Sequence, residues 1–489
     1  MKRIVSNTLY VLFIGFALTL VIACIMLIIN ISRGEGQSLN DIEAVQLSGA
    51  ADEDISFAHI NTEVLSESSG NYQQVSVHFG YDALRNGKKE YLYDHLMAGI
   101  YTIAREADEN GRYRLSRIRV HNYKLSEFDI REVVNAFIYD NPQYFWIENL
   151  FGYAYAEDDT IVEFYSVLSA SDCDKYIKRF NEKVGEILSS IESGKTAYQR
   201  ERIVHDTITR GCTYKTGIKS SSDGWEYFTA YGALVGGEAV CEGYAKSMQV
   251  LLTRVGVQCS MIRGDAGGVA HMWNVVELGG EWYHVDPTWD DVDSENSISY
   301  EYFNIPTDQI LKNHTICDDI ANIRTNEDGE DPDPLIKYNF YVPMCTSREM
   351  NYYQVEGILI RKLDKSCEEA VSALIKDKAL KGETYVPIRF GAELTYSEYI
   401  NKLFYESPYL FYYCLENVNR ELDPEQRIDA ESVFLLKNED FRTLRVRLNY
   451  GEPVGETSVQ SSETSSAESG AANPSESSGT TTAESSGEE

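Results

Sequence analysis

Three residues in the middle of the chain, Cys241, His271 and Asp286, have the types and the order that nucleophilic catalysis uses. In such a site a cysteine thiolate attacks a carbonyl carbon, a histidine moves the proton, and a carboxylate holds the imidazole in one tautomer. Each residue alone is weak evidence, because single cysteines, histidines and aspartates also occur in protein cores. The three can act together only if the surrounding elements bring their side chains into contact.

Cys241 lies at the start of a predicted helix. The residues after it are apolar at helical spacing, and Gly256 ends the pattern; the apolar positions are Ala245, Met248, Leu251, Leu252 and Val255. The unpaired N–H groups in the first turn of a helix carry partial positive charge, which favours a thiolate. This position suits a nucleophile, although a cysteine at a helix start is more often a small buried residue.

His271 and Asp286 lie on two predicted strands that a tight turn joins. Residues 271–278 and 281–286 have strand character, and the Gly279-Gly280 pair between them predicts a two-residue hairpin turn. In that register Leu278 faces Glu281, and His271 is the diagonal neighbour of Asp286 on the same face. Such neighbours have Cβ atoms about 7–8 Å apart, which an imidazole–carboxylate hydrogen bond can bridge.

These residues belong to three linked motifs. They are Val240-Cys241-Glu242-Gly243-Tyr244-Ala245, His271-Met272-Trp273-Asn274 and Trp282-Tyr283-His284-Val285-Asp286-Pro287-Thr288-Trp289-Asp290. Together they resemble the transglutaminase-like superfamily, whose bacterial members carry V-C-x-G-Y-A, H-x-W-N and W-Y-x-V-D-x-T-W. The resemblance covers about residues 197–303. It implies a papain/transglutaminase-like α+β core, in which the helix bearing the cysteine packs on an antiparallel sheet.

The resemblance also implies a role for each residue. Cys241 would attack the carbonyl, His271 would accept and later donate the proton, and Asp286 would orient His271. The Cys241 backbone N–H is the first candidate donor to the oxyanion, and the Tyr231 hydroxyl is a second, speculative one.

Two other residues compete for these roles. His284 lies on the same strand face and is a rival base, but the resemblance selects His271 and leaves His284 as a core histidine. Asp290 could replace Asp286, although Pro287 interrupts the strand between them. The aromatic residues nearby, Trp273, Trp282, Tyr283 and Trp289, are expected to pack around the site. Trp273 and Trp289 are the candidates for lining a substrate groove.

The chain has 489 residues, enough for about three domains. We predict a central core flanked by two smaller α+β domains, with a transmembrane helix at the N-terminus. The boundaries are a cytoplasmic start and transmembrane signal anchor (1–33), a stalk (34–70), an N-terminal α+β domain (71–195), a transglutaminase-like catalytic domain (196–325), a C-terminal α+β domain (335–450) and a disordered Ser/Glu-rich tail (451–489). Asn326 to Pro334, rich in charge and proline, marks a linker that lacks the EF-hand pattern.

Two stretches of the N-terminal domain carry local signals. Residues 73–79 alternate as a strand would, and Ser126 begins a sequence typical of a helix N-terminal cap. The unit from Leu125 to Phe145 resembles the unit from Leu394 to Phe411, which favours a duplication around the middle of the chain, with chance similarity of two strand–helix units as the alternative.

Residues 9–29 carry no charge and are long enough to cross a bilayer. Lys2 and Arg3 precede them, so the positive-inside rule places the N-terminus in the cytoplasm and the rest outside. Val21 to Cys24 resembles a lipobox, but apolar residues follow Cys24, so an uncleaved signal anchor is favoured over a lipoprotein.

Composition excludes several classes of protein. There are 77 acidic and 44 basic residues, a net charge of −33, which excludes a binder of nucleic acid. The eight cysteines outside the membrane segment show no CxxC pattern and are too sparse for a disulfide scaffold. No metal or organic cofactor is indicated.

The sequence therefore predicts a membrane-anchored extracellular thiol enzyme that acts on amide bonds. A peptidase or amidase acting on a protein or peptide at the cell surface is favoured. The alternatives are a protein-glutamine acyltransferase and a non-catalytic surface binding or assembly protein on the same fold.

Overall fold

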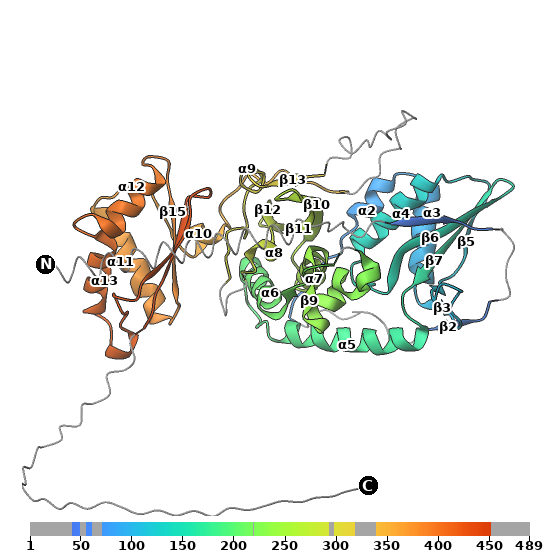
Figure 1. The fold of residues 1–489 in the computed structure, drawn as a ribbon, viewed down its shortest axis with the longest axis horizontal. Coiled ribbons are helices and arrows are strands. Elements are labelled where there is room, and N and C mark those ends of the chain that lie inside the picture. The colour runs from blue at the N-terminus through green and yellow to red at the C-terminus, as the bar shows by residue number, and fades with distance from the viewer. Residues whose placement is uncertain are drawn as a thin grey trace, which may run out of the picture.

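The computed structural model describes residues 42–48, 55–60, 71–218, 220–292, 298–317 and 339–450. These residues form three successive units, each built on its own sheet (Figure 1). The predicted membrane segment 9–29, the lipobox cysteine Cys24, the linker and the tail lie outside the described residues. Within the described part, no helix is both long and apolar enough to cross a membrane.

The N-terminal unit is a mixed sheet with helices packed against it. Its strand order is β1-β6-β7-β4, and β5 also pairs with β7. Its elements are β1 (Glu43–Gln46), β2 (Phe57–His59), α2 (Phe79–Leu84), α3 (Gly87–Gly99), β3 (Thr102–Ala104), β4 (Tyr113–Arg114), β5 (Ile118–Val120), α4 (Glu127–Asp140), β6 (Ile147–Ala156), β7 (Asp159–Ser166) and α5 (Ala170–Ser189).

Two predictions for this unit are corrected. The predicted stalk 34–70 contains two strands of the folded unit, because β1 pairs with β6 and β2 pairs with β3. Residues 73–78 are irregular where a strand was expected, and their backbone meets the end of α7 (Cys241–Arg254) instead of a neighbouring strand, through Val75 N–H donating to the Thr253 carbonyl. The helix predicted after Ser126 is confirmed as α4, with a complete capping box between Ser126 and Asp129.

The central unit packs α7 on a four-stranded antiparallel sheet of order β12-β11-β10-β13. The predicted hairpin register is confirmed, since Leu278 faces Glu281, and Gly279 and Gly280 adopt φ of 65° and 89° as the turn requires. Its elements are α6 (Ala197–Gly211), β8 (Thr213–Tyr214), η1 (Ser221–Asp223), η2 (Trp225–Phe228), η3 (Gly232–Gly236), β9 (Glu238–Ala239), α7 (Cys241–Arg254), β10 (Cys259–Ala266), β11 (Val269–Leu278), β12 (Glu281–Val285), α8 (Pro287–Asp290), α9 (Thr307–Ile310) and β13 (His314–Ile316).

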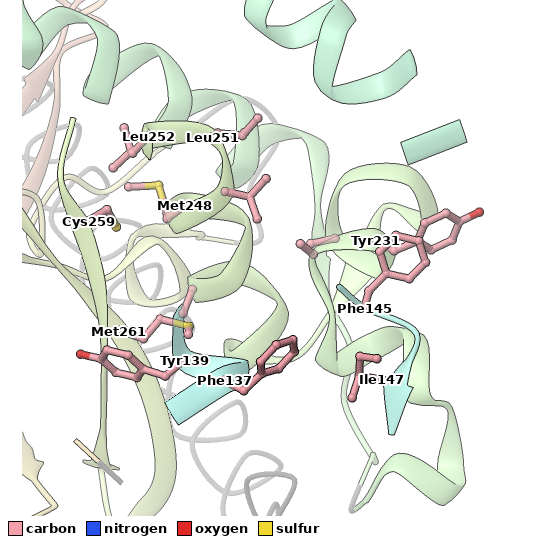
Figure 2. Close-up of a cluster of buried hydrophobic side chains, with 14 of the residues drawn as sticks. Phe137, Tyr139, Phe145, Ile147, Tyr231, Met248, Leu251, Leu252, Cys259 and Met261 are labelled. Carbon is pink, nitrogen blue, oxygen red and sulfur yellow. The ribbon is translucent and has the colours of Figure 1, made fainter. Parts of the chain in front are cut away.

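A continuous apolar core joins the N-terminal and central units. Figure 2 shows Phe137 and Phe145 of the N-terminal unit in the same cluster as Met248 and Leu251 of α7. Helix α5 also runs beneath both units in Figure 1. The helix that begins with Cys241 is therefore held from one side by the sheet and from the other by the N-terminal unit.

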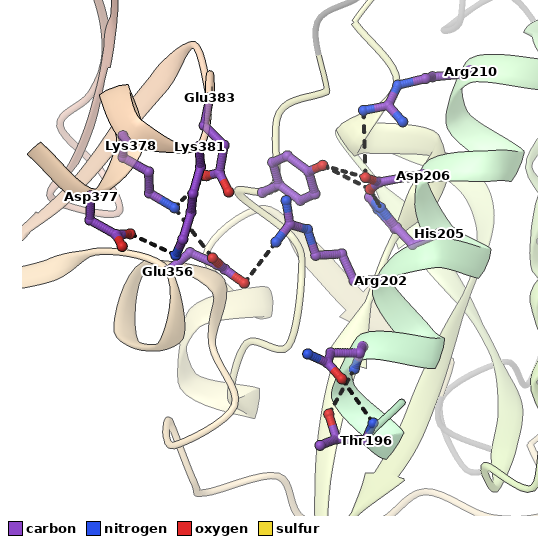
Figure 3. Close-up of polar contacts among 12 residues, drawn as sticks. Thr196, Arg202, His205, Asp206, Arg210, Glu356, Asp377, Lys378, Lys381 and Glu383 are labelled. Carbon is purple, nitrogen blue, oxygen red and sulfur yellow. Dashed lines mark hydrogen bonds and ion pairs between the residues drawn. The ribbon is translucent and has the colours of Figure 1, made fainter. Parts of the chain in front are cut away.

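The C-terminal unit has a sheet of order β14-β15-β17-β16 and a core of its own. Polar contacts connect it to the central unit: Arg202 of α6 pairs with Glu356 at 2.7 Å, and Glu356 also pairs with Lys378 at 3.3 Å (Figure 3). Its elements are α10 (Tyr352–Val355), β14 (Ile358–Ile360), α11 (Lys365–Leu380), β15 (Tyr385–Phe390), α12 (Tyr396–Ile400), η4 (Asn401–Tyr405), α13 (Leu410–Asn419), η5 (Pro424–Gln426), β16 (Phe434–Asn438) and β17 (Thr443–Arg447).

The proposed duplication is limited to one local unit. Ser126 and Thr395 both cap a helix through a complete capping box after a strand. The chain then continues differently, into strand β6 in the first case and into helix α13 in the second. The resemblance between the two flanking units therefore does not extend to their topology.

Candidate active site

Cys241 is the first residue of α7, at the position that the sequence predicts. The preceding residue, Val240, is the N-cap, and its N–H donates to the Tyr227 carbonyl, which fixes the approach of the chain to the helix. The N–H of a first helical residue has no acceptor within its own helix, so the Cys241 amide is available to a ligand. The cysteine is 3% exposed.

The structure brings His271 and Asp286 into direct contact. His271 Nε2 donates to Asp286 Oδ2 at 2.6 Å, just beyond the end of the β11–β12 ladder. Cys241 lies close enough to the same imidazole to raise its pKa. Because Nε2 is engaged by Asp286, Nδ1 is the ring nitrogen left for the thiol. The three predicted residues thus form one contiguous arrangement in the order Cys241, His271, Asp286.

Asp286 is held as an ionised carboxylate. It caps α8, where Oδ1 accepts from the Thr288 and Trp289 N–H groups at 3.0 and 3.1 Å. Its Oδ2 accepts from His271 and, at 3.0 Å, from Nε2 of His314. Burial alone would raise the pKa of Asp286, but the two histidines outweigh burial and lower it.

His271 is held in its protonated form. Burial would lower its pKa, but the charges of Asp286 and Cys241 and their hydrogen bonds raise it to about 10. An imidazolium can act as a general acid, and a cysteine sulfur beside it can act as a nucleophile. The arrangement can therefore supply both a sulfur nucleophile and a proton for a leaving group.

Sequence reasoning missed His314. This residue begins β13, which pairs with β10 so that His314 lies opposite Ala266. It is 28 residues after Asp286 and belongs to none of the three motifs. Only the pairing of a short strand across the sheet brings it to the site, and we find no local pattern that could have predicted this.

The two rival residues have other partners. His284 is fully buried, accepts from Trp273 Nε1 at 3.1 Å and contacts the Thr307 hydroxyl, and burial lowers its pKa to about 3. It is a neutral core histidine. Asp290 lies at the far end of α8, where it faces His205 at 3.3 Å and not His271.

The surroundings of two speculative site residues do not fit the roles predicted for them. The ring of Tyr231 packs against Tyr176 and Phe145, and its hydroxyl interacts with Arg179 of α5, so its contacts argue against the predicted oxyanion role. Trp273 is fully buried and stacks 6.0 Å from His271, which makes it a support for the ring and corrects its assignment to a groove.

Trp289 remains a candidate for the wall of a substrate groove. It is half-buried, and its ring centroid lies 6.4 Å from that of His271. It also packs against His314 at 4.8 Å. Its position beside the catalytic candidates, with part of the indole exposed, is compatible with contact to a bound substrate.

Within the part of the chain that the structure describes, His271, Asp286 and His314 could hold a metal ion, since their ligand atoms lie within 4.8 Å of one another. The hydrogen bonds already account for this geometry, because one carboxylate oxygen accepts from both rings. The opposite side of His271 faces a thiol. The donor set therefore fits proton-bearing groups around an anion better than it fits an ion-binding site.

The other cysteines are poor competitors for a nucleophilic role. No disulfide joins the eight described cysteines, Cys241 included, and only Cys317 among them is more than slightly exposed. Burial raises the pKa of the Cys212, Cys345 and Cys367 thiols to about 12.

Comparison with known proteins agrees with this geometry for the central unit. Residues 186–287 match the family model of the transglutaminase-like superfamily. No curated protein matches the chain. The matched segment contains all three residues of the candidate site, and it begins within α5, ten residues before the boundary at residue 196 that the sequence predicts.

Two solved structures resemble parts of the chain. One is described as "Crystal structure of a TGase" (13% identity, TM-score 0.21, covering 38% of this chain and 54% of that one). The other is "The Crystal Structure of a Putative Cysteine Protease from Cytophaga hutchinsonii" (12% identity, TM-score 0.20, covering 32% and 55%). The chain thus spans about half the length of each. The family match confirms the resemblance seen in the motifs: the chain contains a transglutaminase-like domain.

Proposed function

We propose that this protein is a thiol hydrolase that cleaves amide bonds through Cys241, His271 and Asp286. The single observation that carries the proposal is the position of His271, which donates to the Asp286 carboxylate at 2.6 Å and lies near enough to Cys241 for the two to interact. Because the capped, ionised Asp286 engages Nε2, Nδ1 is the ring nitrogen left for the sulfur. A buried histidine with no nucleophile beside it could not exchange a proton in this kind of catalysis.

The reaction has two stages. The Cys241 thiolate attacks the amide carbonyl carbon, and the backbone N–H of Cys241 can donate to the oxyanion. The C–N bond then breaks as His271 transfers its proton to the leaving amine, which leaves a thioester on Cys241. In the second stage neutral His271 removes a proton from water, the hydroxide attacks the thioester, and the carboxylic acid and the original ion pair are released.

Hydrolysis is favoured over transfer to an amine because bacterial relatives in this superfamily are often regarded as peptidases. An amine that replaced water in the second stage would give the acyl transfer of a transglutaminase with the same three residues. A non-catalytic binding role is less favoured, since all three residues are present and in contact.

We also propose that the enzyme acts outside a membrane to which residues 9–29 anchor it. This rests on the uncharged run and on Lys2 and Arg3 before it. Protein or peptide substrates at the cell surface follow from that location. The net charge of −33 disfavours acidic substrates at low salt.

The test is incubation of the full-length chain with a peptide library and, separately, with a glutamine peptide and a primary amine. Mass spectrometry then distinguishes cleaved peptide, which supports a hydrolase, from amine-linked peptide, which supports an acyltransferase. Cys241→Ala is the variant that must lose either product, and Cys317→Ala is the matched thiol control. If the folded chain forms neither product but does capture a binding partner, the alternative of a non-catalytic binding protein is supported.

A further inference from the structure

The carboxylate of Asp286 serves two histidines through one oxygen atom. Oδ2 accepts from His271 Nε2 at 2.6 Å and from His314 Nε2 at 3.0 Å. Both imidazoles must donate, because an ionised carboxylate can only accept. A triad needs only the first of these hydrogen bonds. The second is therefore an additional feature of this site, supplied by β13 from outside the motif region.

The position of His314 is closely constrained. Its side chain is fully buried, and its ring lies among Trp273, Trp289 and Tyr302, with centroids 5.2, 4.8 and 5.5 Å away. Its Nδ1 lies 2.8 Å from Oδ1 of Asn313, and Nδ2 of Asn313 donates to the Tyr302 hydroxyl at 2.6 Å. The ring thus has a fixed place from which Nε2 reaches Asp286.

His314 is not needed to orient the carboxylate. The two backbone N–H groups of Thr288 and Trp289 already hold Oδ1. What His314 adds is a second donor on the oxygen that His271 uses. A donor that shares an acceptor reduces the negative charge left for the other donor.

We propose that His314 is a positioning residue that shares the charge of Asp286, so that the carboxylate orients His271 without holding its proton too tightly to be donated. This inference rests on the proposed function, since proton donation to a leaving amine is the step it serves. Burial lowers the pKa of His314, although its hydrogen bond to Asp286 opposes that shift.

Among the described residues, few charged or titratable groups lie around Asp286 and its two histidines. Cys241 faces His271 from α7, and His314 faces Asp286 from β13. Asp290 and Tyr302 act on Asp286 through charge at longer range. None of these can substitute for the Nε2 donor of His314, because none donates to Oδ2.

The test measures the pKa of His271 in the full-length chain by NMR with labelled histidine. His314→Phe keeps the ring volume and removes the donor, so the His271 pKa should rise by about half a unit or more, since half a unit is well within the strength of one charged hydrogen bond. His314→Gln retains an N–H donor and should return the pKa to the wild-type value. His284→Phe removes another buried histidine that has no contact with Asp286, and should leave the His271 pKa unchanged.

An unchanged His271 pKa in a folded His314→Phe chain would overturn the inference. If that variant does not fold, the wild-type spectrum decides: His314 must carry its proton on Nε2, and a neutral ring protonated only on Nδ1 would overturn it. These readings do not depend on turnover. A chain that shows the predicted His271 shifts but cleaves no amide would contradict the proposed function and leave the role of His314 intact.

Discussion

The two ends of α8 each carry an aspartate that meets a buried histidine, and only one of these pairs lies beside a nucleophile. Asp286, at the N-terminal end, bonds to His271 at 2.6 Å. Asp290, at the C-terminal end, faces His205 of α6 at 3.3 Å. Both histidines have raised pKa values, about 10 for His271 and about 9 for His205.

The environments of the two pairs differ. Asp286 receives four hydrogen bonds, and the two histidines among the donors lower its pKa, whereas burial raises the pKa of Asp290. His205 is enclosed by the rings of Tyr300 and Phe303, and its other nitrogen faces Asp206 (Figure 3). A raised histidine pKa is therefore not by itself a sign of catalysis, and what distinguishes His271 is the nearby Cys241 thiol.

Replacement of the two aspartates should separate the pairs most strongly. Asp286→Asn loses the charge that orients His271 and should lower kcat/KM by about 10²- to 10⁴-fold, as in other triads. Asp290→Asn keeps its acceptor for the Tyr302 N–H and should change kcat/KM by less than about threefold. Assay of both variants on a peptide found by the library screen checks this; equal losses would remove the distinction between the pairs.

Removal of His205 should act on stability. His205→Phe leaves Asp290 buried without its cationic partner, and breaking a buried pair in this way costs about 3–5 kcal/mol. Urea unfolding followed by tryptophan fluorescence measures the loss. Thiol reactivity of the folded fraction should be unaltered, and a stability equal to that of the wild type would show that the pair contributes nothing.

The pair of His205 and Asp290 should also make the stability of the fold depend on pH. The pKa of His205 is raised from 6.5 in the unfolded chain to about 9 in the fold. Its contribution is therefore complete below pH 6.5 and is lost as pH rises to 9, by about 3 kcal/mol at most. The free energy of unfolding should therefore decrease less between pH 6 and pH 9 in His205→Phe than in the wild type. An identical decrease in both would assign the dependence to other groups.

The outermost contact of this region should have the smallest effect. Arg210 is half-exposed and pairs with Asp206 at 3.5 Å. Exposed pairs of this kind contribute about 0–1 kcal/mol. Arg210→Ala should therefore shift the urea midpoint only slightly, and a larger loss would mean that the surface charge supports the buried His205.

Most of the site could be predicted from the sequence because its geometry is local. The start of α7 follows from apolar spacing after Cys241, and the Gly279-Gly280 turn sets the register that brings His271 to Asp286. The Asp286 side chain also lies where a strand becomes a helix, a change that Pro287 signals.

The rest depends on contacts between distant segments. His314 reaches Asp286 only because β13 pairs with β10, and β1 joins the N-terminal sheet only through β6. Both strands are short, and short strands have weak local signals. The assignment of Trp273 to a groove failed for a related reason: strand alternation gives the face of a residue but not what covers that face.

The most direct test of the central claim is the alkylation rate of each cysteine in the full-length chain across pH, read by peptide mapping. The account predicts that Cys241 reacts far faster than Cys317 near pH 6, although Cys317 is the more exposed, and that His271→Ala abolishes this preference. A Cys241 that reacts no faster than Cys317, or whose preference survives His271→Ala, would contradict it.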